Sequence, residues 1–146
     1  TLVTSAAGAP LDGTFYQTVK GMVTPLEILN KGGDLIITSE CSEGLGSKEF
    51  ISSQKDLLKK GPIKFLENIL KKDFAAIDEW QTEMEIKSLM KGNIYLFSEG
   101  LSDEDKIYTG VNIINDITKT IDESIKRHSN NKVAIIPEGP YLIPVI

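Results

Sequence analysis

Two polar side chains near the start of a predicted helix have the types and spacing to hold a small anionic or hydroxylated ligand. Gln17 and Lys20 follow Tyr16 and are three positions apart, so both project from one helical face. An amide and an ammonium group in this arrangement can bind a carboxylate or a hydroxyl group. Helical periodicity alone is equally consistent with a solvated polar face, so ligand binding by this pair is a hypothesis.

The chain offers little for covalent or metal chemistry. His128 is the only histidine and Cys41 the only cysteine, so the sequence supplies neither a Ser/His/Asp triad nor a nitrogen and sulfur metal site. His128 stands beside Lys126 and Arg127 at a predicted helix end, where cations interact favourably with the helix dipole. We therefore expect a structural role for His128. Cys41 follows a predicted strand but has no histidine to activate it, which leaves a hydrolase that uses Cys41 as a minor alternative.

Four hydrophobic runs, each followed by a cluster of small and polar residues that contains glycine, predict the sheet that positions these groups. Segments with helical periodicity separate the runs, so we expect parallel strands with all four clusters along one edge. Open α/β sheets bind ligands at that edge. The runs are residues 2–4, 35–38, 95–97 and 133–136, and the clusters are residues 5–8, 39–44, 98–100 and 137–139.

The same clusters carry four carboxylates and a glycine turn. Glu40, Glu43, Glu99 and Glu138 can pair as general acid and base, or remain solvated loop carboxylates. The turn at residues 44–46 would direct backbone N–H groups and a helix N-terminus toward an anion. Because the neighbouring carboxylates would repel that anion, a simple tight turn is the alternative interpretation.

Hydrophobic residues at helical spacing predict the helices between the strands. We expect Asp12 to cap the first helix and Pro25 to interrupt and restart it. Ser47 caps a second helix that ends near Gly61, and Pro62 opens a third. These segments predict an α/β three-layer sandwich with a mainly parallel sheet of about four strands. The two remaining helical stripes are Phe74, Ile77, Gln81 and Met84, and Ile113, Ile114, Ile117, Ile121 and Ile125.

Composition limits the class of protein. With 146 residues, of which 40% are hydrophobic, we expect a single α/β domain over residues 1–146. The net charge of −5 argues against nucleic-acid binding. No hydrophobic run approaches the ~18 residues of a membrane span and no signal peptide is recognisable, so we expect a cytoplasmic protein without membrane partners. Because the sequence begins at Thr1 inside a predicted strand, we expect it to be part of a longer protein.

Four stretches of the sequence together resemble a known family. They are the run VTSAAGAPLD with the following FYQTVKG, at residues 3–12 and 15–21; GGDLIITSECSEGLG at residues 32–46; Trp80; and PEGPYLIP at residues 137–144. This pattern is similar to the C-terminal domain of the nickel-dependent lactate racemase family, and the resemblance covers essentially the whole chain. Ala7 and Ala9 stand where the family commonly has a glycine and an aromatic residue, which leaves the identity of the substrate open.

The resemblance implies a two-domain isomerase that acts on a small 2-hydroxy acid. Its N-terminal domain would hold a nickel-pincer nucleotide, which accepts a hydride from C2 of the acid and returns it to the opposite face. By the same resemblance, Lys20 binds a substrate oxygen, Gln17 positions the substrate and Trp80 lines an apolar wall. We expect these three side chains to converge on one hollow, and the isolated domain to be inactive. The alternative is a non-catalytic α/β module that binds a small ligand at the same edge of the sheet.

Overall fold

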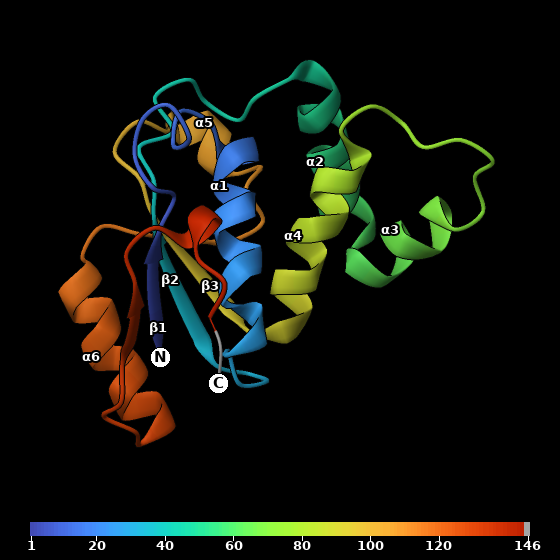
Figure 1. The fold of residues 1–146 in the computed structure, drawn as a ribbon. Coiled ribbons are helices and arrows are strands. Elements are labelled where there is room, and N and C mark those ends of the chain that lie inside the picture. Colours follow the sequence, from blue (N-terminus) through green and yellow to red (C-terminus); the bar gives the residue numbers. More distant parts are fainter. Residues whose placement is uncertain (145–146) are drawn as a thin grey trace.

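The computed structural model describes residues 1–144 and contains a sheet of five parallel strands. The strand order is β4-β3-β2-β1-β5, so β4 and β5 form the edges and β3, β2 and β1 each pair with two neighbours (Figure 1). The predicted α/β class and parallel sheet are confirmed, although the number of strands is higher than the expected four. The strands are β1 Leu2–Ser5, β2 Asp34–Thr38, β3 Asn93–Phe97, β4 Asn112–Ile114 and β5 Ala134–Ile136.

Helices cover both faces of the sheet and give it three layers (Figure 1). The helices α1 and α4 lie against one face, α2 and α3 pack outside α4, and α6 lies against the other face. The bounds are α1 Phe15–Val23, η1 Thr24–Glu27, α2 Lys48–Lys60, α3 Pro62–Ile69, α4 Glu79–Lys91, α5 Asp103–Lys106, α6 Ile117–His128 and η2 Gly139–Tyr141.

Local signals set most of the helix boundaries. Ser47 caps α2 by accepting a hydrogen bond from the backbone N–H of Phe50 at 3.0 Å, and Pro62 is the first residue of α3, as predicted. The proline at position 25 ends α1 in the short helix η1. The cap of α1 is Thr14 rather than Asp12. Asp12 lies in the preceding loop, where its carbonyl oxygen accepts a hydrogen bond from the backbone N–H of Cys41 at 2.7 Å.

Two predicted helical stripes begin later in the structure than the sequence indicated. Ile113 and Ile114 lie in strand β4, because this β-branched pair extends the sheet beside β3, and α6 starts only after Asp116 caps it. Phe74 and Ile77 lie in the loop before α4 and are 88% and 72% exposed. The helical spacing of hydrophobic residues therefore predicted both helices to begin too early in the sequence.

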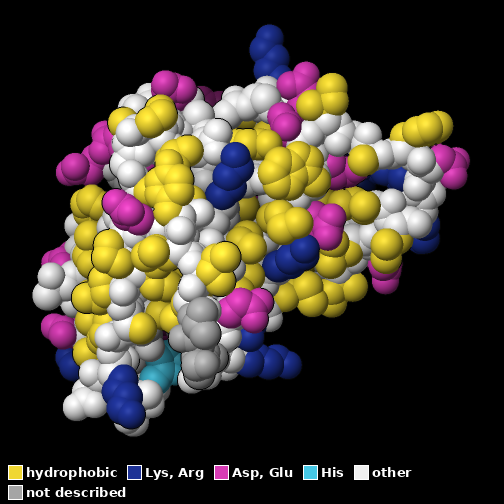
Figure 2. Space-filling view, in the orientation of Figure 1, with side chains coloured by type: hydrophobic (Ala, Val, Ile, Leu, Met, Phe, Trp, Pro, Cys, Tyr) yellow, Lys and Arg dark blue, Asp and Glu magenta, His cyan; other side chains and the backbone are white. Residues whose placement is uncertain are grey.

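Hydrophobic side chains also gather on the outer surface, over α1, η2 and α4 (Figure 2). Trp80 and Tyr141 are 47% and 67% exposed, and Leu142 and Ile143 follow Tyr141 on the surface. None of the helices described between residues 1 and 144 has the length and hydrophobicity of a membrane span.

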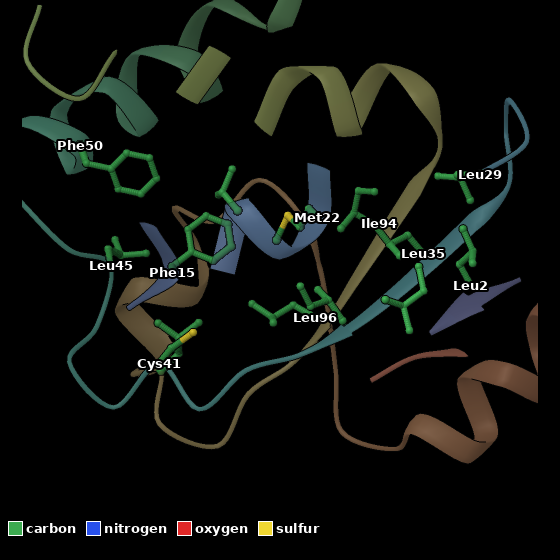
Figure 3. Packing of buried hydrophobic residues seen from close by; sticks show 14 residues of the cluster. Leu2, Phe15, Met22, Leu29, Leu35, Cys41, Leu45, Phe50, Ile94 and Leu96 are labelled. Carbon is green, nitrogen blue, oxygen red and sulfur yellow. The ribbon is translucent and has the colours of Figure 1, made fainter. Parts of the chain in front are cut away.

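The main hydrophobic core lies between α1 and the sheet (Figure 3). Phe15, Val19 and Met22 form the inner face of α1 and are fully buried against side chains of β2 and β3. Burial of each such side chain contributes about 1.5–3 kcal/mol. This packing fixes the rotation of α1 about its own axis, so that Lys20 is left on the exposed side. The sheet residues in this cluster are Leu2, Leu35, Ile37, Ile94, Leu96 and Ile136.

Candidate functional site

Tyr16 lies between two of the predicted site residues and contacts both. The Nζ atom of Lys20 is 5.5 Å from the centroid of the Tyr16 ring. The indole of Trp80, at the start of α4, meets the same ring edge to face, with centroids 6.1 Å apart and an interplanar angle of 87°. The Nε2 atom of Gln81 donates a hydrogen bond to the carbonyl oxygen of Tyr16 at 2.7 Å, which ties α1 to α4. The fold therefore brings Lys20 and Trp80 to one surface.

Gln17 is half-buried on the same turn of α1. Its side-chain oxygen Oε1 is buried and has no hydrogen-bond partner within residues 1–144. A buried carbonyl oxygen without a partner costs about 1–3 kcal/mol, so native structures rarely keep one without a reason. Because the oxygen has less than 1 Å² of exposed surface, a ligand hydroxyl can bond to it only after the neighbouring side chains move.

Lys20 and Trp80 meet at the ring of Tyr16, but neither they nor Gln17 line the hollow beside that ring, so the expected convergence of the three side chains on one hollow is not found there. One hollow, of about 480 Å³, is lined by Tyr16 but not by Gln17, Lys20 or Trp80. Its other lining residues are Thr14, Glu43, Gly46, Ser47 and Asp78.

The surroundings of Tyr16 act on its hydroxyl group as well as on its ring. Burial raises the pKa of Tyr16, and the charge of Asp78 and a hydrogen bond to that carboxylate raise it further. On the side of α2, the ring of Phe50 packs edge to face on Tyr16, with centroids 5.2 Å apart. The phenol is therefore a neutral and well-fixed part of this surface.

A second hollow, of about 280 Å³, lies at the carboxyl ends of the strands. Three of the four predicted clusters meet there, which agrees with the expected parallel arrangement. Asp12, Glu40 and Glu99 surround it, so its electrostatics disfavour an anionic ligand. The remaining lining residues are Ser5, Gly8, Thr38, Ser39 and Phe97.

Cys41 is fully buried and belongs to the hydrophobic core. Its sulfur lies 3.3 Å from the hydroxyl of Thr18 and 3.4 Å from that of Ser39. A nucleophile must reach its substrate, so this burial argues against the alternative of a Cys41 hydrolase.

His128 lies at the opposite end of the sheet from the cluster-bearing edge, in a network around Asp34. The Nε2 atom of His128 is 3.2 Å from the carboxylate of Asp34, and Arg127 makes an ion pair with that carboxylate at 2.5 Å. The network joins α6 to β2, which fits the expected structural role. Among residues 1–144, no group of three or more His, Cys, Asp or Glu side chains is arranged to hold a metal ion.

The sequence pointed to Tyr16 as the neighbour of Gln17 and Lys20 but gave it no role. Its contact with both Lys20 and Trp80 depends on the packing of α1 against α4. Asp78 was not identified from the sequence, because the hydrophobic stripe that starts at Phe74 placed it inside a predicted helix, whereas it precedes α4 in the structure.

Comparison with known proteins shows which family the sequence resembles. Residues 1–144 match the family described as "Lactate racemase C-terminal domain". The chain is 29% identical over 147 residues to a lactate racemase of Thermoanaerobacterium thermosaccharolyticum, covering 97% of this chain and 34% of that protein. It is 29% identical over 145 residues to a lactate racemase of Lactiplantibacillus plantarum, covering 94% of this chain and 32% of that protein.

A solved structure agrees with these sequence matches. The lactate racemase apoprotein from Thermoanaerobacterium thermosaccharolyticum superimposes with a TM-score of 0.81 at 26% sequence identity, over 99% of this chain and 34% of that one. The chain thus spans about a third of the length of the relatives it matches.

Proposed function

The chain belongs to the lactate racemase C-terminal domain family, and we propose that it is the substrate-positioning domain of a 2-hydroxy acid racemase or epimerase. The observation that carries this proposal is the meeting of Lys20 and Trp80 on the ring of Tyr16. A cation, an amide oxygen and an aromatic wall are the groups that a small hydroxy acid needs for recognition.

Each side chain has a distinct task in this proposal. The ammonium group of Lys20 binds the carboxylate of the acid through a charge-assisted hydrogen bond. The unpartnered oxygen of Gln17 accepts a hydrogen bond from the 2-hydroxyl group. Trp80 and Tyr16 cover the carbon chain and exclude water from that side. Two polar contacts and one apolar wall fix the orientation of C2, which is what a reaction at a single carbon requires.

The described residues of this chain are not suited to bind the metal of a nickel nucleotide. The described residues offer no metal-binding cluster, and the single histidine faces Asp34 at the other end of the sheet. The family resemblance implies hydride transfer to a nickel-pincer nucleotide, and we place that cofactor on an N-terminal domain outside this chain. The contribution of residues 1–146, as one α/β domain of a two-domain enzyme, is then to bind and orient the acid. The domain alone would be inactive.

Racemisation by the complete, cofactor-loaded protein that contains this chain tests the proposal. We expect interconversion of D- and L-lactate, or of a larger 2-hydroxy acid, when the products are separated by chiral chromatography. In deuterated water the product should keep its C2 hydrogen, because a hydride that is transferred and returned does not exchange with solvent. Deuterium at C2 would contradict hydride transfer, and a loaded enzyme that racemises no 2-hydroxy acid would overturn the proposed function.

The hollow at the carboxyl ends of the strands favours one alternative, a non-catalytic module that binds a small ligand. The two functions use different residues. Binding in that hollow should depend on Glu40 and Glu99 and should be indifferent to Lys20. Titration calorimetry with a panel of small cationic and hydroxylated ligands, on the wild type and on Glu99→Gln and Lys20→Ala, separates the two.

A further inference from the structure

Asp78 occupies the N-cap position of α4 but does not cap that helix. An aspartate at this position normally accepts a hydrogen bond from a backbone N–H in the first turn of its own helix. The backbone of Asp78 is left-handed instead, with φ 61° and ψ 0°, and its side chain makes no capping hydrogen bond. Non-glycine residues rarely adopt this conformation, which persists only where the surroundings hold it.

The carboxylate of Asp78 is directed toward the start of α2. Its Oδ2 atom accepts a hydrogen bond from the hydroxyl of Ser47 at 2.5 Å. That hydroxyl is itself the N-cap acceptor of α2. Asp78 and Ser47 line the same hollow as Tyr16, on α1. The carboxylate therefore joins the beginnings of α2 and α4 beside Tyr16.

The candidate substrate surface is built on these connections. Trp80 is two residues after Asp78 and packs on the ring of Tyr16. Lys20 contacts the same ring. A change in the position of the Tyr16 ring would therefore alter the positions of both the indole and the ammonium group. The start of α4, which carries the indole, is held by the hydrogen bond from Ser47 to Asp78.

We propose that Asp78 is a positioning residue whose carboxylate, rather than capping α4, holds the start of α4 against α2 and so sets the placement of Trp80 against Tyr16 and Lys20. The role of that placement in binding a hydroxy acid rests on the proposed function. The placement itself does not, and the two parts are tested by separate measurements.

Two substitutions at Asp78 separate its carboxylate from its backbone conformation. Asp78→Asn removes the charge but keeps the size of the side chain. Asparagine also tolerates the left-handed backbone conformation. Asp78→Gly keeps the backbone and removes the side chain. Asp73→Asn is the matched control, because Asp73 is an exposed carboxylate in the same loop.

Spectroscopy of the complete protein reports the placement directly. Trp80 emission is obtained as the difference from the Trp80→Phe protein, and the Tyr16 titration as the difference from Tyr16→Phe in ultraviolet absorbance. We expect Asp78→Asn to lower the pKa of Tyr16, since the carboxylate raises it. We expect Asp78→Gly to shift Trp80 emission to longer wavelength as the indole becomes more exposed. Asp73→Asn should change neither.

The possible results of these measurements decide separately on the positioning role and on its link to substrate binding. Unchanged Tyr16 titration in Asp78→Asn together with unchanged Trp80 emission in Asp78→Gly overturns the positioning role. If Asp78→Gly does not fold, the titration of Asp78→Asn decides alone. In an active racemase we expect Asp78→Asn to raise KM about tenfold with a smaller change in kcat, and unchanged kinetics would remove the link to substrate. A wild type without racemase activity would refute the proposed function and leave the spectroscopic result standing.

Discussion

The ammonium nitrogen of Lys20 lies 5.5 Å from the centroid of the Tyr16 ring. The electron-rich face of an aromatic ring attracts a cation, so this contact restricts a flexible side chain at an otherwise exposed position. The ring of Tyr16 is in turn packed between Phe50 and Trp80. In the proposed function, Lys20 is thus oriented before the acid arrives, which would reduce the entropy lost on binding.

Replacing Lys20 by alanine should abolish most activity without unfolding the protein. Loss of a charged partner for the substrate costs about 2–5 kcal/mol, which corresponds to a loss of roughly 10²-fold or more in kcat/KM. The side chain is exposed, so circular dichroism and the melting temperature should stay close to those of the wild type. Lys31→Ala, which removes another exposed lysine in the turn before β2, is the control. Racemisation kinetics equal to the wild type would refute the role of Lys20.

Gln17→Leu should stabilise the fold while weakening substrate binding. The substitution removes a buried oxygen without a partner, so we expect the free energy of unfolding to rise by up to about 1 kcal/mol. The same oxygen is the proposed acceptor for the 2-hydroxyl group, and KM should therefore increase. Urea denaturation measures the first effect and initial-rate kinetics the second. A destabilised variant with unchanged KM would show that Gln17 serves the fold and not the substrate.

Much of the architecture was predictable because its determinants are local. Ser47 and Pro62 act within one turn of chain, and the alternation of strand and helix fixes a parallel sheet. Ile113 and Ile114 fit both a helical stripe and a strand, and the pairing of β4 with β3 decides between them. Asp12 was an equally good cap by type, but a hydrogen bond from the distant Cys41 holds it in the loop.

The site was predictable only in part, for the same physical reason. Gln17 and Lys20 are neighbours on one helix, so their spacing alone puts them together. The contact between Tyr16 and Trp80 joins α1 to α4 and depends on tertiary packing. The left-handed backbone of Asp78 accompanies a hydrogen bond from Ser47, the N-cap of α2, and no pattern within α4 indicates this contact.

Asp34→Asn should loosen α6 from the sheet in a pH-dependent way. Burial raises the pKa of Asp34, but hydrogen bonds from Asn93, Ser124 and His128 and the charge of Arg127 outweigh it, so the pKa is lowered from 3.8. A lowered folded-state pKa means that the stabilisation is present above pH 3.8 and is lost as pH falls through the folded-state value.

We therefore expect Asp34→Asn to be less stable than the wild type at pH 7, by about 2–3 kcal/mol, and the difference to shrink in acid. Urea denaturation of both proteins between neutral and acidic pH measures it. Asp56→Asn, at an exposed carboxylate paired with Lys60, should cost less than about 0.5 kcal/mol. A difference that stays constant down to the acid limit would contradict the ionic role of Asp34.

Glu85 should make the protein less stable as the pH rises. The side chain is fully buried between α2 and α4, where burial raises its pKa from 4.5 to about 8, opposed by a hydrogen bond from Gln54. The folded protein thus keeps a neutral carboxyl group at neutral pH, whereas the unfolded chain ionises above pH 4.5. Because the folded-state pKa is the higher one, the stabilisation is complete below pH 4.5 and is lost progressively up to about pH 8.

The measurement that isolates Glu85 is the difference in free energy of unfolding between the wild type and Glu85→Gln. Glutamine is neutral at every pH, so the wild type should lose stability relative to the variant across this range, by a few kcal/mol in total. Glu83→Gln, on the exposed side of the same helix, should show almost no pH-dependent difference. Since the hydrogen-bond partner of Glu85 is Gln54 on α2 and Glu85 has no part in the proposed binding of the acid, the variant should also retain any racemase activity of the complete protein. A difference between wild type and Glu85→Gln that does not vary with pH would mean that Glu85 ionises in the folded core, with a compensating charge or water beside its unpartnered oxygen.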